Sequence, residues 1–505
     1  MKIFEINLIP RVVIIWVGKI PPKLKLCTQC LILRILEAGD ISGWVIFLVR
    51  KIRSNRMIHK YKMFGTNVLV DVNSGAIHEV DDVTYDILDY FEDYNIDYIK
   101  DKLKDKYKSS EIEEAHYEIE QLKKEGTLFS EDLYQEYVPT WNKKHVVKAL
   151  CLHISHDCNL RCKYCFAGTG NFGGERVNMS KEVGIAAIDF LVLNSGSRKN
   201  LEIDFFGGEP LINFDTVKAV VEYAKSIEKK YNKHFNFTIT TNGLLLNDDI
   251  LDYINKNMGN VVLSIDGRKE TNDRMRCRVD GTGSYDTILP KFKKVAESRN
   301  QDKYYVRGTF TRENLDFCED VIHLADEGFK QISVEPVVAA KGTGYDIRKE
   351  DLPYLFEEYE KLAKEYVERD KAGKWFNFFH FMIDLTQGPC IVKRLSGCGS
   401  GSEYLAITPE GDIYPCHQFV GMKDFNMGNV LEKTFDTSIQ KEFGQCNVYT
   451  KNECRNCWAK FYCSGGCLAN AHQFNGTINS VYDIGCELER KRVECAIWIK
   501  TQDKV

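Results

Sequence analysis

The sequence predicts an α/β protein organised around a partial (β/α)6 barrel, with a small domain before the barrel and a cysteine-rich domain after it. Between residues 147 and 340, strand-like apolar runs alternate with helical patterns, which is typical of a parallel sheet built from βα units. Several of these runs end in glycine-rich or polar turns, and three closely spaced cysteines follow the first run. Because the strands of such a barrel end at one rim, we expect these turns and cysteines to form one site.

The composition excludes several classes of protein. A chain of 505 residues has room for about two or three domains. The formal net charge of −5 does not indicate a general nucleic-acid or membrane-surface binder, so we expect neither partner. The 18 cysteines cluster in metal-type spacings, and the long chain has no clean export signal. This favours a reducing, cytoplasmic location over a secreted disulfide scaffold.

Residues 1–56 differ from the rest of the chain. They contain ten Lys/Arg and three Asp/Glu, and their apolar runs are shorter than the ~20 residues that span a bilayer. We expect the natural chain to start at Met57 and residues 1–56 to come from a wrong start site; a basic, membrane-associating extension is the alternative. Cys27 and Cys30 have the spacing of a metal or redox pair, but an isolated pair is not specific.

Residues 57–138 are predicted to form a small domain. Alternating runs indicate short strands over 58–64, 66–72 and 76–80, and three helical stretches follow them. This winged-helix-like order lacks a Lys/Arg-rich recognition helix, so DNA binding is not expected. The unit resembles the leader-peptide recognition domains of many peptide-modifying enzymes, which would bind an extended leader by strand addition. A purely structural domain is the alternative.

Residues 139–345, entered through a linker at 139–144, are predicted to form the barrel, and residues 346–389 a helical connector with a helix over 351–371. Six βα units are expected. Their strands are predicted at Ala149–His156, Leu201–Phe206, Phe235–Thr240, Val261–Ile265, Tyr304–Thr311 and Gln331–Val337.

Cys158, Cys162 and Cys165 are spaced C-x3-C-x2-C directly after the first predicted strand. Three closely spaced thiolates can hold three corners of a [4Fe–4S] cluster and leave the fourth iron open for an outside ligand. The alternative is a zinc site with a fourth ligand from His153 or His156.

This triplet resembles the signature of the radical SAM enzymes. The resemblance implies that S-adenosylmethionine binds the open iron and that an electron from the cluster cleaves it to a 5′-deoxyadenosyl radical. In such an enzyme the protein positions the reactants and shields them from solvent. The resemblance makes the three cysteines the catalytic cluster ligands and places Tyr164, just before the third cysteine, near the adenine.

Glycine-rich or polar turns follow the next strands, and glycines let a backbone approach a ligand closely. By the same resemblance, the GGEP-type loop after the second strand contacts the amino group of S-adenosylmethionine. The loops after the third and fourth strands reach its ribose and carboxylate. A guanidinium after the fourth strand suits the carboxylate, although a surface Arg is the alternative there, and Arg307 is a further candidate. The predicted cosubstrate contacts are Gly207, Gly208, Glu209, Pro210, Asn242, Ser264 and Arg276.

Residues 390–500 contain seven spaced cysteines. A pair of zinc ribbons is the alternative, but gaps of five and three residues fit zinc ribbons poorly. The spacing resembles the SPASM domain, which implies two auxiliary [4Fe–4S] clusters and three clusters in all. The first auxiliary set has only three members, so Cys390 or an open position for a substrate thiolate would complete it. The resemblance assigns Cys398, Cys416 and Cys467 to the first auxiliary set, and Cys454, Cys457, Cys463 and Cys486 to the second.

The domain order, with stretches such as 388–398 and 414–419, resembles the maturases of "six cysteines in forty-five residues" peptides. The resemblance implies thioether crosslinks in a cysteine-rich precursor peptide with a leader, and an electron donor such as ferredoxin or flavodoxin. Alternatives are formylglycine formation in a sulfatase, carbon–carbon crosslinking, or a non-enzymatic iron–sulfur electron carrier or zinc-stabilised scaffold. The N-terminal domain argues against sulfatase maturation. The glycine-rich loops argue against a carrier, which needs no cosubstrate pocket.

Overall fold

The computed structural model describes most of the chain after residue 56. In the part of the chain before residue 57, the strands β1 (Leu31–Leu36) and β2 (Val45–Val49) pair antiparallel. The cysteine pair at 27 and 30, the predicted linker and Cys390 lie outside the described residues. The described residues are 57–136, 138, 146–383, 385 and 394–502, together with the backbone of 31–36 and 45–49.

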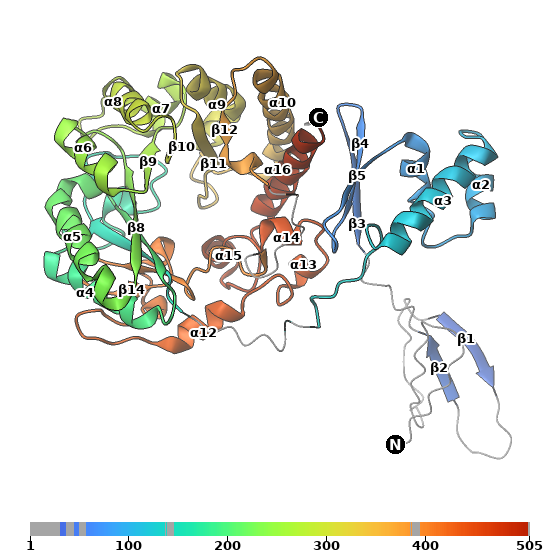
Figure 1. Ribbon diagram of the computed structural model, residues 1–505, viewed down its shortest axis with the longest axis horizontal. Coiled ribbons are helices and arrows are strands. Elements are labelled where there is room, and N and C mark those ends of the chain that lie inside the picture. The colour runs from blue at the N-terminus through green and yellow to red at the C-terminus, as the bar shows by residue number, and fades with distance from the viewer. Residues whose placement is uncertain are drawn as a thin grey trace.

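Six parallel strands form a curved sheet inside the ring of helices on the left of Figure 1. They are neighbours in the order in which they occur in the chain, as expected for successive βα units. The strands are β6 (Ala149–Ser155), β7 (Asn200–Gly207), β8 (His234–Thr241), β9 (Asn260–Ser264), β10 (Tyr304–Phe310) and β11 (Gln331–Pro336). The predicted α/β class and the six predicted barrel strands are therefore confirmed.

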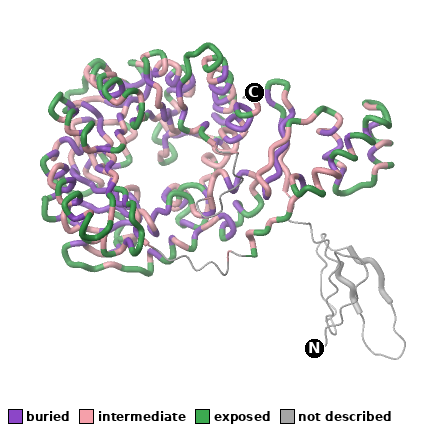
Figure 2. The backbone as a smooth tube through the Cα atoms, in the orientation of Figure 1, coloured by how far each residue is buried: buried purple, intermediate pink, exposed green. Residues whose placement is uncertain are grey.

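Helices cover the outer face of this sheet, and the exposed residues lie along the outside of the ring (Figure 2). Leu150, Leu152 and Ile154 of β6 pack into the core with these helices. Because strand side chains alternate, Cys151 and His153 face the barrel interior. The helices are α4 (Lys181–Asn194), α5 (Phe214–Tyr231), α6 (Asp248–Asn257), α7 (Lys269–Met275), α8 (Tyr285–Ser298), α9 (Phe317–Asp326) and α10 (Leu352–Lys371).

The C-terminal domain extends the barrel sheet, which sequence reasoning did not predict. Strand β13 (Tyr404–Ile407) pairs in parallel with β6, and β14 (Ile413–Tyr414) pairs antiparallel with β13. At the opposite edge, β12 (Asn377–Phe378) pairs with β11. Cys416 follows β14 by two residues, so this pairing ties a predicted auxiliary cysteine to the strand that precedes the triplet.

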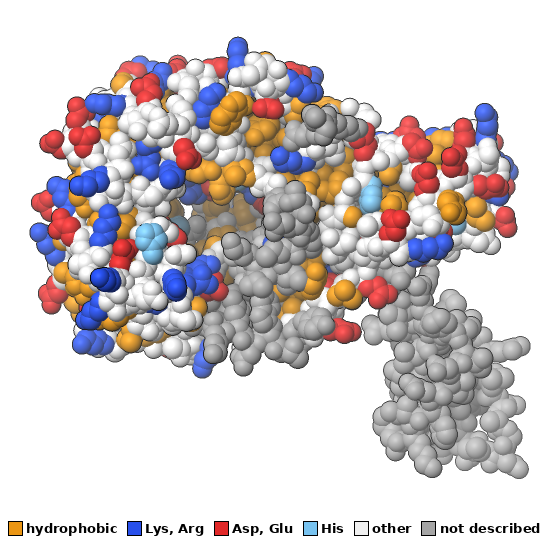
Figure 3. Space-filling view, viewed as in Figure 1, with side chains coloured by type: hydrophobic (Ala, Val, Ile, Leu, Met, Phe, Trp, Pro, Cys, Tyr) orange, Lys and Arg blue, Asp and Glu red, His pale blue; other side chains and the backbone are white. Residues whose placement is uncertain are grey.

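Helices make up much of the rest of the C-terminal domain, and α16 packs along α10. No helix among the described residues is both long enough and apolar enough to cross a membrane. On the face shown in Figure 3, positive and negative side chains are interspersed. The helices are α12 (Thr437–Gln445), α13 (Asn452–Arg455), α14 (Lys460–Cys463), α15 (Leu468–Asn475) and α16 (Asp483–Gln502).

The N-terminal domain has its own hydrophobic core, which includes Leu69, Ile87 and Ile119. Its three strands form an antiparallel sheet in the order β3-β4-β5. The predicted three strands and three helices are present; the winged-helix comparison stays a prediction. The elements are β3 (Ile58–Met63), β4 (Thr66–Asp71), β5 (Ile77–Val80), α1 (Asp82–Ile87), α2 (Ile96–Leu103) and α3 (Ser109–Glu125).

The N-terminal domain docks on the C-terminal domain through a buried polar contact. Lys460 Nζ lies 2.8 Å from Asp132 Oδ2, and both side chains are only 2% exposed. The Tyr449 hydroxyl donates to the same carboxylate at 2.7 Å. Nearby, the rings of His59 and Trp458 stack with centroids 3.8 Å apart. The first domain therefore rests on the segment that carries the second predicted auxiliary set.

Replacing Asp132 by Asn should loosen this interface, because the Lys460 ammonium would stay buried without its counter-charge. Breaking a buried pair from one side costs about 3–5 kcal/mol, and we expect a comparable fall in the free energy of unfolding, measured by urea denaturation. Asp105→Asn, on the exposed surface of the same domain, is the control. Equal effects of the two variants would contradict the assignment.

The same contact predicts a pH dependence. Although burial alone would raise it, hydrogen bonds from Lys460 and Tyr449 hold the pKa of Asp132 below its ordinary value. A lowered carboxyl pKa stabilises the fold at neutral pH, and that contribution is lost as the pH falls through the lowered value. As the pH is lowered, the free energy of unfolding of the parent should therefore fall by a contribution that is missing in Asp132→Asn, as measured by acid unfolding.

Candidate functional site

The cysteine triplet lies on the loop that follows β6, at the carboxyl rim of the barrel. The segment after α7 holds this loop by backbone hydrogen bonds. Arg161 N–H donates to the Cys277 carbonyl at 2.7 Å, and Lys163 N–H donates to the Met275 carbonyl at 2.9 Å. The loop is therefore fixed by the chain that follows the fourth barrel strand.

The three thiols lie within electrostatic reach of one another. The pKa of Cys158 is raised to about 11 and that of Cys162 to about 12, mainly by burial and in part by the neighbouring Cys165. A raised pKa keeps these thiols protonated, and iron binds the deprotonated thiolate. Cluster formation therefore has to release the thiol protons. Three free thiols gathered on one loop are the donor set that the site-specific [4Fe–4S] cluster requires.

The glycines after β7 let two loops of the protein come together. Gly208 N–H donates to the Ser155 carbonyl at 2.8 Å, and Glu209 N–H donates to the Asp157 carbonyl at 2.9 Å. A Cβ on Gly208 would lie 2.2 Å from the Asp157 oxygen, and one on Gly207 would lie 2.4 Å from the Ser155 oxygen. Close approach was expected toward a ligand; the contact observed is with the backbone that enters the cysteine loop.

Glu209 is buried and joins the second and third strand ends. Its carboxylate accepts hydrogen bonds from Leu211 N–H at 3.0 Å, the Thr241 hydroxyl at 2.8 Å and Asn242 N–H at 2.7 Å. Burial raises the pKa of Glu209, and these donors oppose the increase. The carboxylate is thus engaged within the protein, and its contribution to a cosubstrate site would be to orient the loop backbone.

Asn242 connects this loop to the cysteine triplet. Its amide Nδ2 donates to Asn159 Oδ1 at 2.8 Å and lies 3.6 Å from Cys158 Sγ. Two of the predicted residue groups, the triplet and the loop after β8, are therefore in direct contact.

Ser264 ends β9, where it is paired with Arg307 of β10, and the Arg307 side chain forms an ion pair with Glu335 at 2.7 Å.

Tyr164 and Arg276 meet at a buried carboxylate that sequence reasoning did not select. The Tyr164 hydroxyl lies 2.8 Å from both carboxylate oxygens of Asp266, and Arg276 donates to that hydroxyl at 3.0 Å. Burial raises the pKa of Asp266 to about 6, against the effect of Arg276. Arg276 is 8% exposed, and its Nε has no partner in the described structure. The guanidinium predicted for the cosubstrate carboxylate therefore already faces a protein carboxylate.

The first predicted auxiliary set lies beside the barrel interior. Cys398, Cys416 and Cys467 are within electrostatic reach of one another, since the pKa of Cys416 is raised to about 12 mainly by burial and in part by the other two thiols. The ring of His417 lies 5.4 Å from that of Phe166, centroid to centroid. These rings belong to the residues directly after Cys416 and Cys165, so the segments that carry the two sets are in contact through this aromatic pair.

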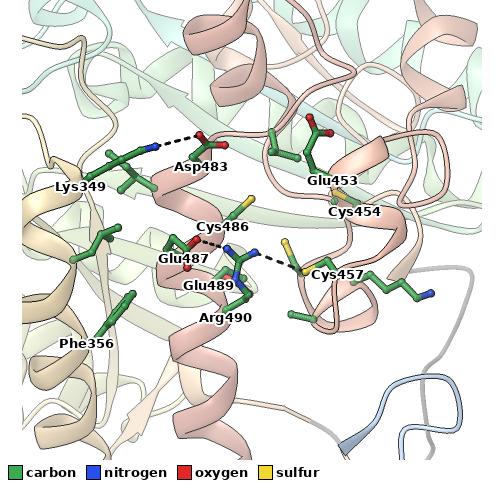
Figure 4. A pocket seen from close by; sticks show the side chains of 17 residues that line it. Lys349, Phe356, Glu453, Cys454, Cys457, Asp483, Cys486, Glu487, Glu489 and Arg490 are labelled. Atoms are coloured by element: carbon green, nitrogen blue, oxygen red, sulfur yellow. Dashed lines mark hydrogen bonds and ion pairs between the residues drawn. The ribbon is translucent and has the colours of Figure 1, made fainter. Parts of the chain in front are cut away.

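The four cysteines of the second predicted set line one cavity of about 420 Å³. Figure 4 shows Cys454, Cys457 and Cys486 around it, with Arg490 between Glu487 and Cys457. Arg490 Nη1 lies 3.9 Å from Cys457 Sγ. Among the described residues no group of His, Cys, Asp and Glu is gathered tightly around a single-ion position. Four thiols around a shared cavity suit a cluster with iron at several corners.

Comparison with known protein families identifies the two larger parts of the chain. The model of the radical SAM superfamily matches residues 152–325, and that of SPASM, an iron–sulfur cluster-binding domain, matches residues 398–458. The chain is therefore a radical SAM enzyme with a SPASM domain. Its cofactors are [4Fe–4S] clusters and S-adenosylmethionine. The electron-carrier and zinc-scaffold alternatives are wrong.

Similar proteins include several radical SAM enzymes. The radical SAM cyclopropyl synthase TigE of Paramaledivibacter caminithermalis is 22% identical over 449 residues, which cover 82% of this chain and 89% of the relative. The cysteine-type anaerobic sulfatase-maturating enzyme of Clostridium novyi is 24% identical over 65% of this chain and 90% of the relative. The fold is shared with a solved structure described as "Native anSMEcpe with bound AdoMet", at a TM-score of 0.58 and 20% identity over 71% of this chain and 100% of that one.

Replacing Gly208 by Ala should disrupt the triplet site, because the new methyl group would clash with the Asp157 carbonyl at 2.2 Å. We expect the variant to retain about eight irons per chain instead of about twelve, and to lose cleavage of S-adenosylmethionine. Iron content and 5′-deoxyadenosine release measure the two effects. Gly259→Ala is the matched control, since its methyl group would meet the nearest atom at 3.7 Å. Full iron content and cleavage in both variants would refute the steric argument.

Proposed function

We propose that this protein is a maturase that forms thioether crosslinks in a ribosomally made, cysteine-rich precursor peptide. The proposal depends most on one observation: the N-terminal domain docks on the segment that carries Cys457, through the His59–Trp458 stack and the Asp132–Lys460 pair. The candidate leader-binding domain is thereby joined to the C-terminal domain, which carries the predicted auxiliary clusters. A solved structure of the same fold is described as "Native anSMEcpe with bound AdoMet and Cp18Cys peptide", which supports a peptide substrate.

The sheet of the N-terminal domain offers a place for the leader. Strands β3 and β5 are its edges, and within the described structure each pairs only with β4. An edge strand presents backbone N–H and C=O groups to which an extended peptide can add. A leader held there would raise the local concentration of the core peptide at the barrel.

The residues of the barrel rim would hold the reactants in place. When bound, S-adenosylmethionine and the reduced triplet cluster would provide the radical chemistry that removes a hydrogen atom from the acceptor residue. Glu209 fixes the loop beside the triplet, and Asp266 holds the Tyr164 hydroxyl. The first auxiliary set has three described cysteines, and either Cys390, which lies outside the described residues, or a substrate thiolate would complete it. The Phe166–His417 contact joins the segments that carry the two sets, which supports placing the acceptor carbon and the sulfur in one site.

Carbon–carbon bond formation in a peptide is the second candidate. It is favoured by the similarity to the cyclopropyl synthase, which extends over 82% of this chain, whereas the sulfatase-maturating relative covers 65%. A thioether consumes a cysteine thiol, but a carbon–carbon bond leaves every thiol free. Alkylation of the product therefore distinguishes the two reactions.

Metal content tests the three proposed clusters. Anaerobically purified protein should contain about twelve irons per chain, because each of three clusters holds about four. Changing Cys454, Cys457, Cys463 and Cys486 to Ala should remove about four of them and leave the other two clusters. Zinc in place of iron would contradict the cluster assignment, and a loss of all iron would contradict the separation into sets.

Mass spectrometry of a co-expressed, cysteine-rich peptide encoded beside the gene tests the reaction. Each crosslink should remove a pair of hydrogens and one alkylatable thiol, and reductant should not reverse it. The triple variant Cys158→Ala, Cys162→Ala and Cys165→Ala should leave the peptide unmodified. Cys318→Ala, a buried cysteine outside the three sets, is the control. An unchanged peptide mass alongside active cleavage of S-adenosylmethionine would reject the proposed substrate, and lost hydrogens with all thiols alkylated would favour the second candidate.

A further inference from the structure

A lysine of the C-terminal domain is buried without a carboxylate partner among the described residues. Lys451 is 1% exposed, and its Nζ donates to the Gly465 carbonyl oxygen at 2.9 Å. No carboxylate in the described part of the chain lies within ion-pair distance of it. Lys460, the other buried lysine of this region, is paired with Asp132. The two side chains are alike in burial and differ in their counter-charge.

The position of Lys451 relates it to both sets. It precedes α13, which carries Cys454 of the second set. Its acceptor Gly465 lies between Cys463 of the second set and Cys467 of the first. Although burial raises the pKa of both Cys454 and Cys467, the charge of Lys451 acts against that increase at each thiol. One ammonium is therefore within electrostatic reach of both sets.

A buried ammonium needs a negative charge nearby, because the cost of leaving water is large and one carbonyl oxygen does not offset it. Thiolate-ligated [4Fe–4S] clusters have reduction potentials that depend on net charge and on hydrogen bonds to sulfur. When clusters occupy both sets, their thiolate ligands supply the counter-charge that the protein itself does not provide at Lys451.

We propose that Lys451 is a shared electrostatic positioning residue that raises the reduction potentials of both auxiliary clusters. Each cluster gains one negative charge when it accepts an electron, and a fixed cation close to both stabilises that state. The reaction proposed above leaves a surplus electron when the carbon–sulfur bond forms, and the auxiliary clusters would accept it. The inference thus rests on the proposed cluster sets and deepens their role; it does not depend on which bond the enzyme makes.

Arg490 provides a contrast, because its contacts are restricted to the second set. Its guanidinium approaches Cys457 Sγ at 3.9 Å and is paired with Glu487. Against the increase that burial causes, its charge lowers the pKa of Cys454 and Cys486. A variant at Arg490 should therefore alter one auxiliary cluster, and a variant at Lys451 both.

The test is a potentiometric titration followed by electron paramagnetic resonance, using full-length holoprotein in which Cys158, Cys162 and Cys165 are Ala, so that only auxiliary signals remain. Lys451→Met should shift both potentials to more negative values, and Lys451→Arg should keep them near those of the parent. Arg490→Gln should shift only the second. Lys349→Gln is the control: this side chain lines the cavity of the second set but is 76% exposed and paired with Asp483, so neither potential should move. A Lys451→Met protein with full iron content and one or both potentials unchanged would overturn the proposal.

A second measurement covers the case in which Lys451→Met assembles poorly. Without clusters, the parent carries an uncompensated buried charge, so the iron-free Lys451→Met protein should be at least as stable to urea as the iron-free parent. A residue needed only for packing would give the opposite order, and that result would also overturn the proposal. Neither measurement uses the peptide, so failure of the thioether assignment would appear separately, in the product mass.

Discussion

The parallel pairing of β13 with β6 is the constraint on which the arrangement of the sites depends. Leu405 and Ile407 are buried in the same core as Leu150 and Leu152, so the C-terminal domain is part of the barrel sheet. A domain attached only by a linker would be free to move relative to the triplet. Here the triplet and Cys416 follow two strands of one sheet, and the distance between two cofactor sites is set by strand register.

Buried charges around the rim then fix the loops that the strands present. Glu209 accepts hydrogen bonds from two different strand ends, and Asp266 accepts one from Tyr164 and one from Thr309 N–H. Unsatisfied buried carboxylates are costly, so each of these side chains holds its donors in one geometry. The rim is therefore pre-organised by polar contacts within the protein, and a bound cosubstrate would meet loops that are already in position.

The sequence alone predicted the regular elements and the metal-type spacings. The six barrel strands were predicted to within about two residues, because short apolar runs between turn residues leave a local signal. Burial alternates with period two in β8, β9 and β10, whereas β6 is buried at every position. The cysteine spacings predicted three sets, and the assignment of each cysteine to its set stays a prediction. The contact of Tyr164 with Asp266 joins residues 102 positions apart, and no local pattern predicts which rim side chains the register brings together. Lys451 was missed for a similar reason, because a lysine in a polar turn is usually exposed and only the tertiary fold buries it.

The two buried lysines of the C-terminal domain suggest how the parts of the enzyme depend on one another. Lys460 is neutralised by Asp132, which the N-terminal domain supplies. Among the described residues Lys451 donates to a backbone carbonyl and has no carboxylate partner, so thiolate-bound iron would supply its counter-charge. Each ammonium is costly to bury alone. Docking of the first domain removes one of these penalties and assembly of the auxiliary clusters removes the other. Since both lysines lie in the stretch that carries Cys454, Cys457 and Cys463, domain docking and cluster assembly stabilise the same short segment, and each would favour the other.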